Sequence, residues 1–227
     1  MKDKLRQIKE LIDKAAIGCG RDPASIRLVA VSKTVALERV EEAIEAGITD
    51  LGENYVQEAR EKIHHLSSYP VSWHFIGHLQ TNKAKYAVRL FDLIHSVDSL
   101  KLAKELDKQA KKYAKIQPIL IQVNVAEEAS KSGVSVENTR QLITGIQSLN
   151  NLALRGLMTM PPYFYAPEKV RPYFKALRLL RDKIETEGIA RESIPELSMG
   201  MTGDFEVAIQ EGATIVRVGT AIFGERN

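Results

Sequence analysis

The sequence is poor in cysteine, in aromatic residues and in long apolar runs. Cys19 is the only cysteine, so no disulfide can form within the chain and a cysteine-based metal site is not expected. No run approaches the roughly 18 apolar residues of a membrane-spanning helix. Residues 1–20 are charged throughout and lack the apolar centre of a secretory signal. We therefore expect a protein of the reducing cytoplasm, without membrane contact.

An excess of one charge is also missing. Lys and Arg number 32 and Asp and Glu 29, a formal net charge of +3. The isoelectric point near 8.8 suggests nucleic-acid binding, but acidic residues interrupt the basic ones along most of the chain. The densest basic run, Lys108 to Lys115, has the spacing of an exposed helix face. We therefore predict no nucleic-acid partner.

Apolar spacing alternates between helix and strand periods along the chain. An N-terminal stripe at Leu5, Ile8, Leu11, Ile12 and Ala15 predicts one helix over residues 3–16. Beyond it, short apolar runs typical of buried strands alternate with helical patterns. The expected strands are 26–31, 48–52, 72–76, 93–96, 118–125, 154–158, 197–199 and 213–218, and the expected helices are 38–46, 54–66, 81–90, 99–113, 136–149, 167–187 and 203–211.

This alternation predicts a parallel α/β fold. Eight strands, each but the last followed by a helix, favour a closed (β/α)8 barrel with an extra N-terminal helix. The 227 residues are enough for one barrel, so we expect a single domain over residues 1–227. A doubly wound sheet is the alternative, but no GxGxxG sequence follows the first strand and no GxxxxGK[ST] sequence occurs.

In a barrel the functional site lies where the strands end, and Lys33 is the first candidate there. It directly follows the first expected strand. A lysine at the mouth of a buried strand can lose hydration and become a nucleophile for carbonyl groups. His74 and His78 lie near the third strand, but they share no helix face and no third ligand is evident, so we predict no metal site.

Two loops rich in glycine and hydroxyl groups follow the last two strands. They read SMGMTGD, from Ser198 to Asp204, and VRVGTAIFG, from Val216 to Gly224. Barrels often bind phosphate at this position, through backbone N–H groups and hydroxyls. A carbonyl-capturing lysine beside such loops leaves two alternatives open, namely pyridoxal phosphate (PLP) or a phosphorylated aldehyde or ketone substrate.

Six segments carry a resemblance to a known family. They are LVAVSKT (28–34), GENYVQE (52–58), WHFIGHLQTNK (73–83), RGLMTM (155–160), LSMGMTGDFEVAI (197–209) and VRVGTAIFG (216–224). In this order they resemble the pyridoxal phosphate homeostasis proteins, the YggS-like family, whose barrel is similar to that of alanine racemases. One departure is His78, at a position where the family commonly has proline.

The resemblance implies a role for each candidate residue. Lys33 would form the internal aldimine with PLP, and Arg217 would face the pyridine nitrogen. Asn54 and His74 would line the ring. The phosphate would lie against the two loops, at Ser198, Met199, Gly200, Thr202, Gly219 and Thr220.

The resemblance also implies a function with little turnover. A permanent cation at Arg217 would keep the ring nitrogen neutral and weaken the ring as an electron sink. The sequence ends at Asn227, so we expect it to lack the second domain from which racemases take their second base. We therefore expect a monomeric PLP-binding protein of PLP homeostasis and amino-acid and keto-acid balance, passing PLP to apo-enzymes. The alternatives are a PLP-dependent racemase or lyase and a cofactor-free Schiff-base aldolase.

Overall fold

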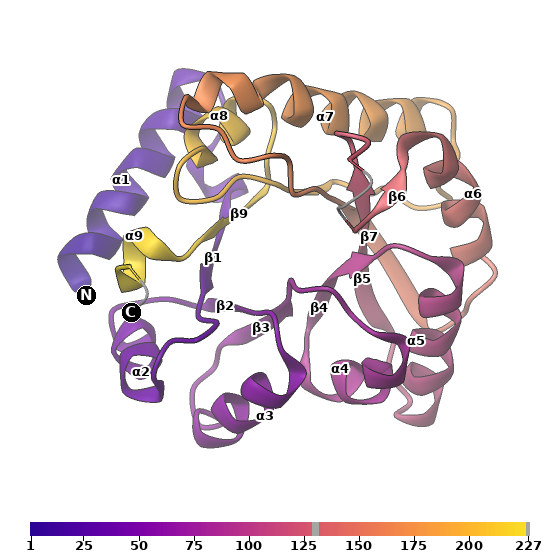
Figure 1. The fold of residues 1–227 in the computed structure, drawn as a ribbon, viewed down its shortest axis with the longest axis horizontal. Coiled ribbons are helices and arrows are strands. Elements are labelled where there is room, and N and C mark those ends of the chain that lie inside the picture. The colour runs from indigo at the N-terminus through magenta and orange to yellow at the C-terminus, as the bar shows by residue number, and fades with distance from the viewer. Residues whose placement is uncertain (129–131, 226–227) are drawn as a thin grey trace.

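A closed ring of parallel strands forms the centre of the molecule in the computed structural model, which describes residues 1–128 and 132–225 (Figure 1). The strands of this part of the chain are β1 (Arg27–Val31), β2 (Asp50–Glu53), β3 (Ser72–Phe75), β4 (Leu93–Val97), β5 (Gln117–Asn124), β6 (Val134–Ser135), β7 (Leu152–Met158), β8 (Glu196–Ser198) and β9 (Ile215–Val218).

The sheet closes on itself. The strands follow one another in the order β4, β3, β2, β1, β9, β8, β7 and β5, and the pairing of β4 with β5 completes the ring. Every pairing is parallel. The predicted (β/α)8 barrel is confirmed, and closure excludes the doubly wound alternative. The two-residue β6, which pairs with β5, was not predicted, because so short a segment has no periodicity.

Helices surround the barrel (Figure 1). They are α1 (Lys2–Gly18), α2 (Leu37–Glu45), α3 (Val56–His65), α4 (Ala84–Leu90), α5 (Leu100–Lys112), α6 (Val136–Ile146), α7 (Arg171–Thr186), α8 (Phe205–Gln210) and α9 (Thr220–Phe223), with the 3-10 turns η1 (Pro23–Ser25), η2 (Thr81–Lys83) and η3 (Pro167–Val170).

Two helix predictions need correction. The expected helix over 167–187 is divided into η3 and α7, because Pro172 near the start of α7 lacks an N–H to continue the preceding turn. The last strand was expected to have no helix after it, but α9 follows with Gly219 at its N-cap. Four residues are too few for a helical stripe to be visible in the sequence.

The extra N-terminal helix lies on the outside of the barrel against α8 and α9 (Figure 1). Its buried face consists of Leu5, Ile8, Ile12, Ala15 and Ala16. Leu11, which the predicted stripe included, is 40% exposed. The N-terminal amine pairs with Glu42 of α2 at 3.3 Å, so the helix is also held at its first residue.

Strand alternation separates an inner from an outer core. Val29, Leu93, Leu120, Met158 and Ile215 form a buried cluster inside the barrel. Their strand neighbours belong to the larger core between barrel and helices, which includes Trp73 and Phe75. Because side chains two positions apart share a face, His95 and Arg217 point inward, as Leu93 and Ile215 do.

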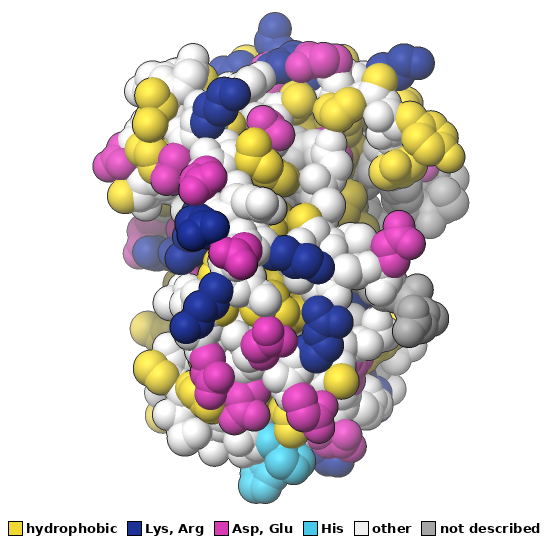
Figure 2. Space-filling model, turned by 90° about the vertical axis from the view of Figure 1, so that its left-hand side faces the viewer, with side chains coloured by type: hydrophobic (Ala, Val, Ile, Leu, Met, Phe, Trp, Pro, Cys, Tyr) yellow, Lys and Arg dark blue, Asp and Glu magenta, His cyan; other side chains and the backbone are white. Residues whose placement is uncertain are grey.

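The outer face over α1 carries both charges. Figure 2 shows Lys and Arg interspersed with Asp and Glu there, with apolar side chains between them. The basic run from Lys108 to Lys115 belongs to α5 and the turn after it. Its last residue, Lys115, donates hydrogen bonds to the carbonyls of Val88 and Phe91 at the C-terminal end of α4. Among the described residues, no helix is long and apolar enough to cross a membrane.

Candidate functional site

A cavity of about 290 Å³ opens at the C-terminal end of the barrel, where the strands β1, β8 and β9 end. It brings together Lys33, Arg217 and both glycine-rich loops, as the sequence predicts. Its wall is completed by the segment after β7, which contributes aromatic side chains. The lining residues are Val31, Lys33, Tyr163, Phe164, Tyr165, Met201, Thr202, Gly203, Asp204, Arg217, Gly219 and Thr220.

Lys33 is half-buried in the turn that follows β1. The next residue, Thr34, has a φ of 60°, a backbone conformation that residues with side chains rarely adopt. Such strain persists only where the surroundings hold it. The side chain of Lys33 therefore leaves from a backbone fixed in an uncommon geometry.

A buried ion cluster holds the residues on both sides of Lys33. Lys62 of α3 donates to the carbonyl of Ser32 at 2.6 Å, to Glu53 Oε1 at 2.9 Å and to Glu58 Oε1 at 2.6 Å. Ser32 Oγ donates to Glu53, and the Thr34 N–H donates to Glu58 Oε1 at 2.6 Å. Both neighbours of Lys33 are thus tied to one cluster.

We call Lys62, Glu53 and Glu58, with the groups of Ser32 and Thr34 that they bind, the Lys62 cluster. The charges of Lys62 and Glu53 are buried. Glu53 is fully buried and the Lys62 side chain is 7% exposed. Burial raises the pKa of Glu53, although the ion pair and hydrogen bond with Lys62 oppose it. The sequence interpretation missed this arrangement. Its signals were the GENYVQE segment, which supplies both carboxylates, and the Glu58–Lys62 spacing of one helical turn.

The two loops present unused backbone donors to the cavity. The N–H groups of Thr202, Gly203, Gly219 and Thr220 find no acceptor within residues 1–128 and 132–225. Gly200 makes the turn with a φ of 93°, and a Cβ there would lie 2.6 Å from Ala208 Cβ. Backbone N–H groups without an internal acceptor, in residues that line one cavity, are the donor set that a phosphate group needs, so the loops fit that part of PLP.

Arg217 lies on the floor of the cavity, 3% exposed. Its Nη1 donates to Ser198 Oγ at 2.6 Å and its Nη2 to the Thr159 carbonyl at 2.9 Å. Burial lowers its pKa to about 10, partly offset by Asp204, so it is a cation at neutral pH. Asp204 Oδ1 accepts a bond from the Met201 N–H, which fixes the first loop.

Some predicted residues lie elsewhere. Ser198 is fully buried beneath Arg217, so its hydroxyl is not available to a phosphate group, and Met199 packs in the outer core. Asn54 lines a neighbouring cavity together with His78. His74 points into the barrel interior, where it contacts His95 and Asp50. The structure does not place Asn54 or His74 in the Lys33 cavity, and their contact with a cofactor ring stays a prediction.

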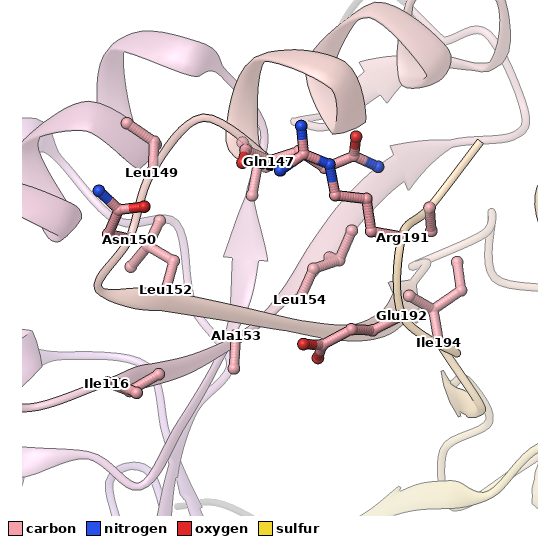
Figure 3. Close-up of a pocket in the computed structure, with 12 residues that line it drawn as sticks. Ile116, Gln147, Leu149, Asn150, Leu152, Ala153, Leu154, Arg191, Glu192 and Ile194 are labelled. Atoms are coloured by element: carbon pink, nitrogen blue, oxygen red, sulfur yellow. Dashed lines mark hydrogen bonds between the residues drawn. The ribbon is translucent and has the colours of Figure 1, made fainter. Parts of the chain in front are cut away.

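A second cavity, of about 370 Å³, lies at the N-terminal ends of β5 and β7, away from Lys33. Figure 3 shows leucine side chains and Arg191, which lies beside Gln147. Arg191 Nη1 donates to the Gln147 carbonyl at 3.4 Å. This cavity holds none of the predicted site residues. In the described part of the chain, no group of three or more His, Cys, Asp or Glu side chains is arranged to hold a metal ion.

The burial of His95 predicts that the folded protein loses stability in acid. Its pKa lies well below the ordinary value, mainly because burial disfavours the imidazolium, and also because the cations Arg217 and Arg27 oppose a further positive charge. Below about pH 6.5 the unfolded chain therefore binds a proton at this residue that the folded chain does not. We expect this residue to cost up to about 1.4 kcal/mol of unfolding free energy for each pH unit below that point.

The check is urea unfolding at pH 7.5 and 5.5 for the wild type and His95→Gln. The other histidines are present in both proteins, so the change with pH in the stability difference between wild type and variant isolates His95. The difference in unfolding free energy between wild type and His95→Gln should be smaller at pH 5.5 than at pH 7.5, or should change sign. A difference that is the same at both pH values would contradict this assignment.

Comparison with known proteins identifies the class to which this barrel belongs. Residues 7–227 match the family model described as alanine racemase, N-terminal domain. The alanine racemase of Clostridium difficile 630 shares the fold, with a TM-score of 0.74 at 16% identity, over 99% of this chain and 57% of that one.

Closer relatives narrow the class. The pyridoxal phosphate homeostasis proteins of Aquifex aeolicus and Escherichia coli K12 are 47% and 41% identical, over 99% and 98% of this chain and 97% and 95% of theirs. PipY of Synechococcus elongatus PCC7942, solved with PLP bound, is 34% identical with a TM-score of 0.82, over 94% of this chain and 100% of that one. The chain belongs to the pyridoxal phosphate homeostasis protein family.

Proposed function

We propose that this protein binds PLP in the Lys33 cavity and acts in PLP homeostasis. The names of the relatives at 40–47% identity and the PLP-bound PipY structure support the ligand. The observation that carries the proposal is that one cavity is lined by Lys33, by the Arg217 cation and by four residues whose backbone N–H groups have no acceptor within the described residues. An amine, a cation and an anion site match the aldehyde, the ring nitrogen and the phosphate of PLP.

Lys33 holds the ligand covalently in this proposal. Its Nζ adds to the aldehyde carbon, a C=N bond forms, and the aldehyde oxygen leaves as water. The Lys62 cluster fixes the backbone on both sides of Lys33, so Nζ needs little reordering to reach the carbonyl group. The free N–H groups of the two loops bind the phosphate at the other end, which sets the direction in which the ligand lies.

Arg217 determines what the bound ligand can do. PLP supplies an electron sink whose strength depends on protonation of its ring nitrogen. A guanidinium donates hydrogen bonds and accepts none, so it leaves that nitrogen unprotonated. We propose that the protein therefore holds and releases PLP with little or no turnover.

The second candidate function is a PLP-dependent racemase or lyase. Tyr163 and Tyr165 favour it, because they line the Lys33 cavity and a phenol can serve as a second base. However, their side chains are 72% and 96% exposed, and no hydrogen bond within the described residues positions them. A base held so loosely supports slow chemistry at best, because proton transfer needs a fixed geometry.

The remaining parts of the proposal concern the cellular setting. We propose a cytoplasmic monomer that supplies PLP to apo-enzymes and so affects amino-acid and keto-acid balance. The single exposed cysteine is suited to that reducing compartment.

Borohydride reduction tests the proposed function. The protein mixed with PLP should turn yellow, and borohydride should fix the ligand irreversibly to one peptide. Mass spectrometry should find the adduct on Lys33. A cofactor-free aldolase would show no PLP adduct, and fixation on several exposed lysines with none on Lys33 would contradict the proposal.

A further inference from the structure

A continuous chain of buried hydrogen bonds crosses the inside of the barrel from the cavity to the opposite end. Arg217 Nη1 donates to Ser198 Oγ at 2.6 Å, and Ser198 Oγ lies 2.9 Å from His95 Nδ1. His95 Nε2 lies 2.9 Å from His74 Nδ1, and His74 Nε2 lies 3.1 Å from Asp50 Oδ1. The three middle residues are at most 1% exposed.

The positions of the hydrogens follow from the two ends of this chain. Arg217 only donates, so Ser198 Oγ accepts from it, and its own O–H is left to donate to His95 Nδ1. A neutral imidazole that accepts at Nδ1 carries its hydrogen on Nε2. His95 therefore donates to His74 Nδ1, and His74 in turn donates from Nε2 to the carboxylate of Asp50.

The opposite direction leaves a buried hydrogen without a partner. If His95 donated from Nδ1, Ser198 Oγ would accept from both neighbours and its O–H would need a third partner. Among residues 1–128 and 132–225, Ser198 Oγ has hydrogen bonds only to Arg217 and His95. An unpaired buried hydroxyl is unfavourable, so every hydrogen in the chain points from Arg217 toward Asp50.

The far end of the chain is anionic. Burial alone would raise the pKa of Asp50, but hydrogen bonds from His74 and Thr49 outweigh it and lower that pKa. Arg27, with a half-exposed side chain, lies 3.8 Å from Asp50 and 3.6 Å from Glu196, at an open cavity of about 480 Å³. The oriented bonds thus run from a buried cation to a stabilised carboxylate, and each bond polarises the next.

We propose that Ser198, His95, His74 and Asp50 are positioning residues that orient the Arg217 guanidinium toward the ring nitrogen of bound PLP. Ser198 Oγ accepts a hydrogen bond from Nη1 of Arg217, and the Thr159 carbonyl accepts one from Nη2. Two hydrogen bonds thereby fix the guanidinium plane of a residue that lines the cavity, and its other N–H groups remain for the ring nitrogen in this proposal. This inference rests on the proposed function, because it concerns PLP in the Lys33 cavity.

Two substitutions at His95 separate positioning from simple packing. In His95→Gln the amide can accept from Ser198 with its oxygen and donate to His74 with its nitrogen, which preserves the direction of the chain. In His95→Leu both bonds are lost at similar volume. We expect His95→Leu to raise the Kd for PLP about tenfold and to shift the absorbance maximum of the bound ligand, and His95→Gln to restore most of both.

Ser96→Ala is the matched control. Ser96 neighbours His95 on β4 and is equally buried, yet its hydroxyl has no hydrogen-bond partner within the described residues. Removing it should leave the Kd and the spectrum of bound PLP unchanged. Equal Kd values and spectra for wild type, His95→Leu and His95→Gln would overturn the inference.

A measurement without PLP tests the direction of the chain itself. Nitrogen-15 NMR of the wild type should show both His95 and His74 as neutral rings with the hydrogen on Nε2. A hydrogen on Nδ1 of His95 would overturn the inference even if PLP binds as proposed. Failure of the wild type to bind PLP would instead contradict the proposed function, and this NMR result would still be measurable.

Discussion

Replacing Lys33 by alanine is expected to abolish covalent capture of PLP. The variant should lack the yellow absorbance that borohydride removes, because no other lysine lines the cavity among the described residues. The loops and Arg217 remain, so PLP should still bind through its phosphate and ring nitrogen. We expect the Kd to rise on the order of a hundredfold, which corresponds to about 2.8 kcal/mol. Absorbance titration measures both changes.

Lys83→Ala is the control for this experiment. Lys83 is a half-buried lysine close to the barrel mouth, but it lines the neighbouring cavity that contains Asn54. Its removal should leave the spectrum, the Kd and the borohydride adduct as in the wild type. A yellow, reducible complex in Lys33→Ala would show that another amine captures PLP, and it would refute the role assigned to Lys33.

The fold was predictable because each strand and helix leaves a local signal. A strand buried on both faces needs a short apolar run, and a helix packed on a barrel needs a stripe, so the ring of eight strands could be read from periodicity. The strand and the α-helix that were missed, β6 and α9, have two and four residues. They arise from contacts with the rest of the barrel and not from any pattern of their own.

The site was predictable only in part, for the same reason. Lys33, Arg217 and the two loops follow strand ends, and topology brings all strand ends of one direction together. The contacts beneath them depend on which side chains meet inside the barrel. His95 reaches Ser198 across 103 positions of sequence, and the pattern around either residue does not indicate this pairing. Ser198 was therefore assigned to the phosphate, whereas its hydroxyl bonds to Arg217.

Replacing Lys62 by methionine is expected to destabilise the fold strongly and to weaken PLP binding. The change leaves Glu53 buried without its cation, beside the second carboxylate of Glu58, and it removes the donor to the Ser32 carbonyl. Breaking a buried ion pair by removing one partner costs about 3 to 5 kcal/mol. Urea unfolding at pH 8 measures this loss, and PLP titration measures the effect on Lys33, whose neighbours lose their anchor.

The pH dependence and a second substitution show whether the buried charge is the cause. Without Lys62 the pKa of Glu53, already raised by burial, should rise further, so the folded state binds a proton that the unfolded state has released above about pH 4.5. Lys62→Met should therefore be less destabilised at pH 5 than at pH 8.

Adding Glu53→Gln to Lys62→Met removes the buried carboxylate charge and should recover much of the stability at pH 8. PLP affinity should stay low in this double variant, because the bond from Lys62 to Ser32 is still absent. Recovery of stability and affinity together would mean that the Lys62 cluster serves the fold alone and does not position Lys33.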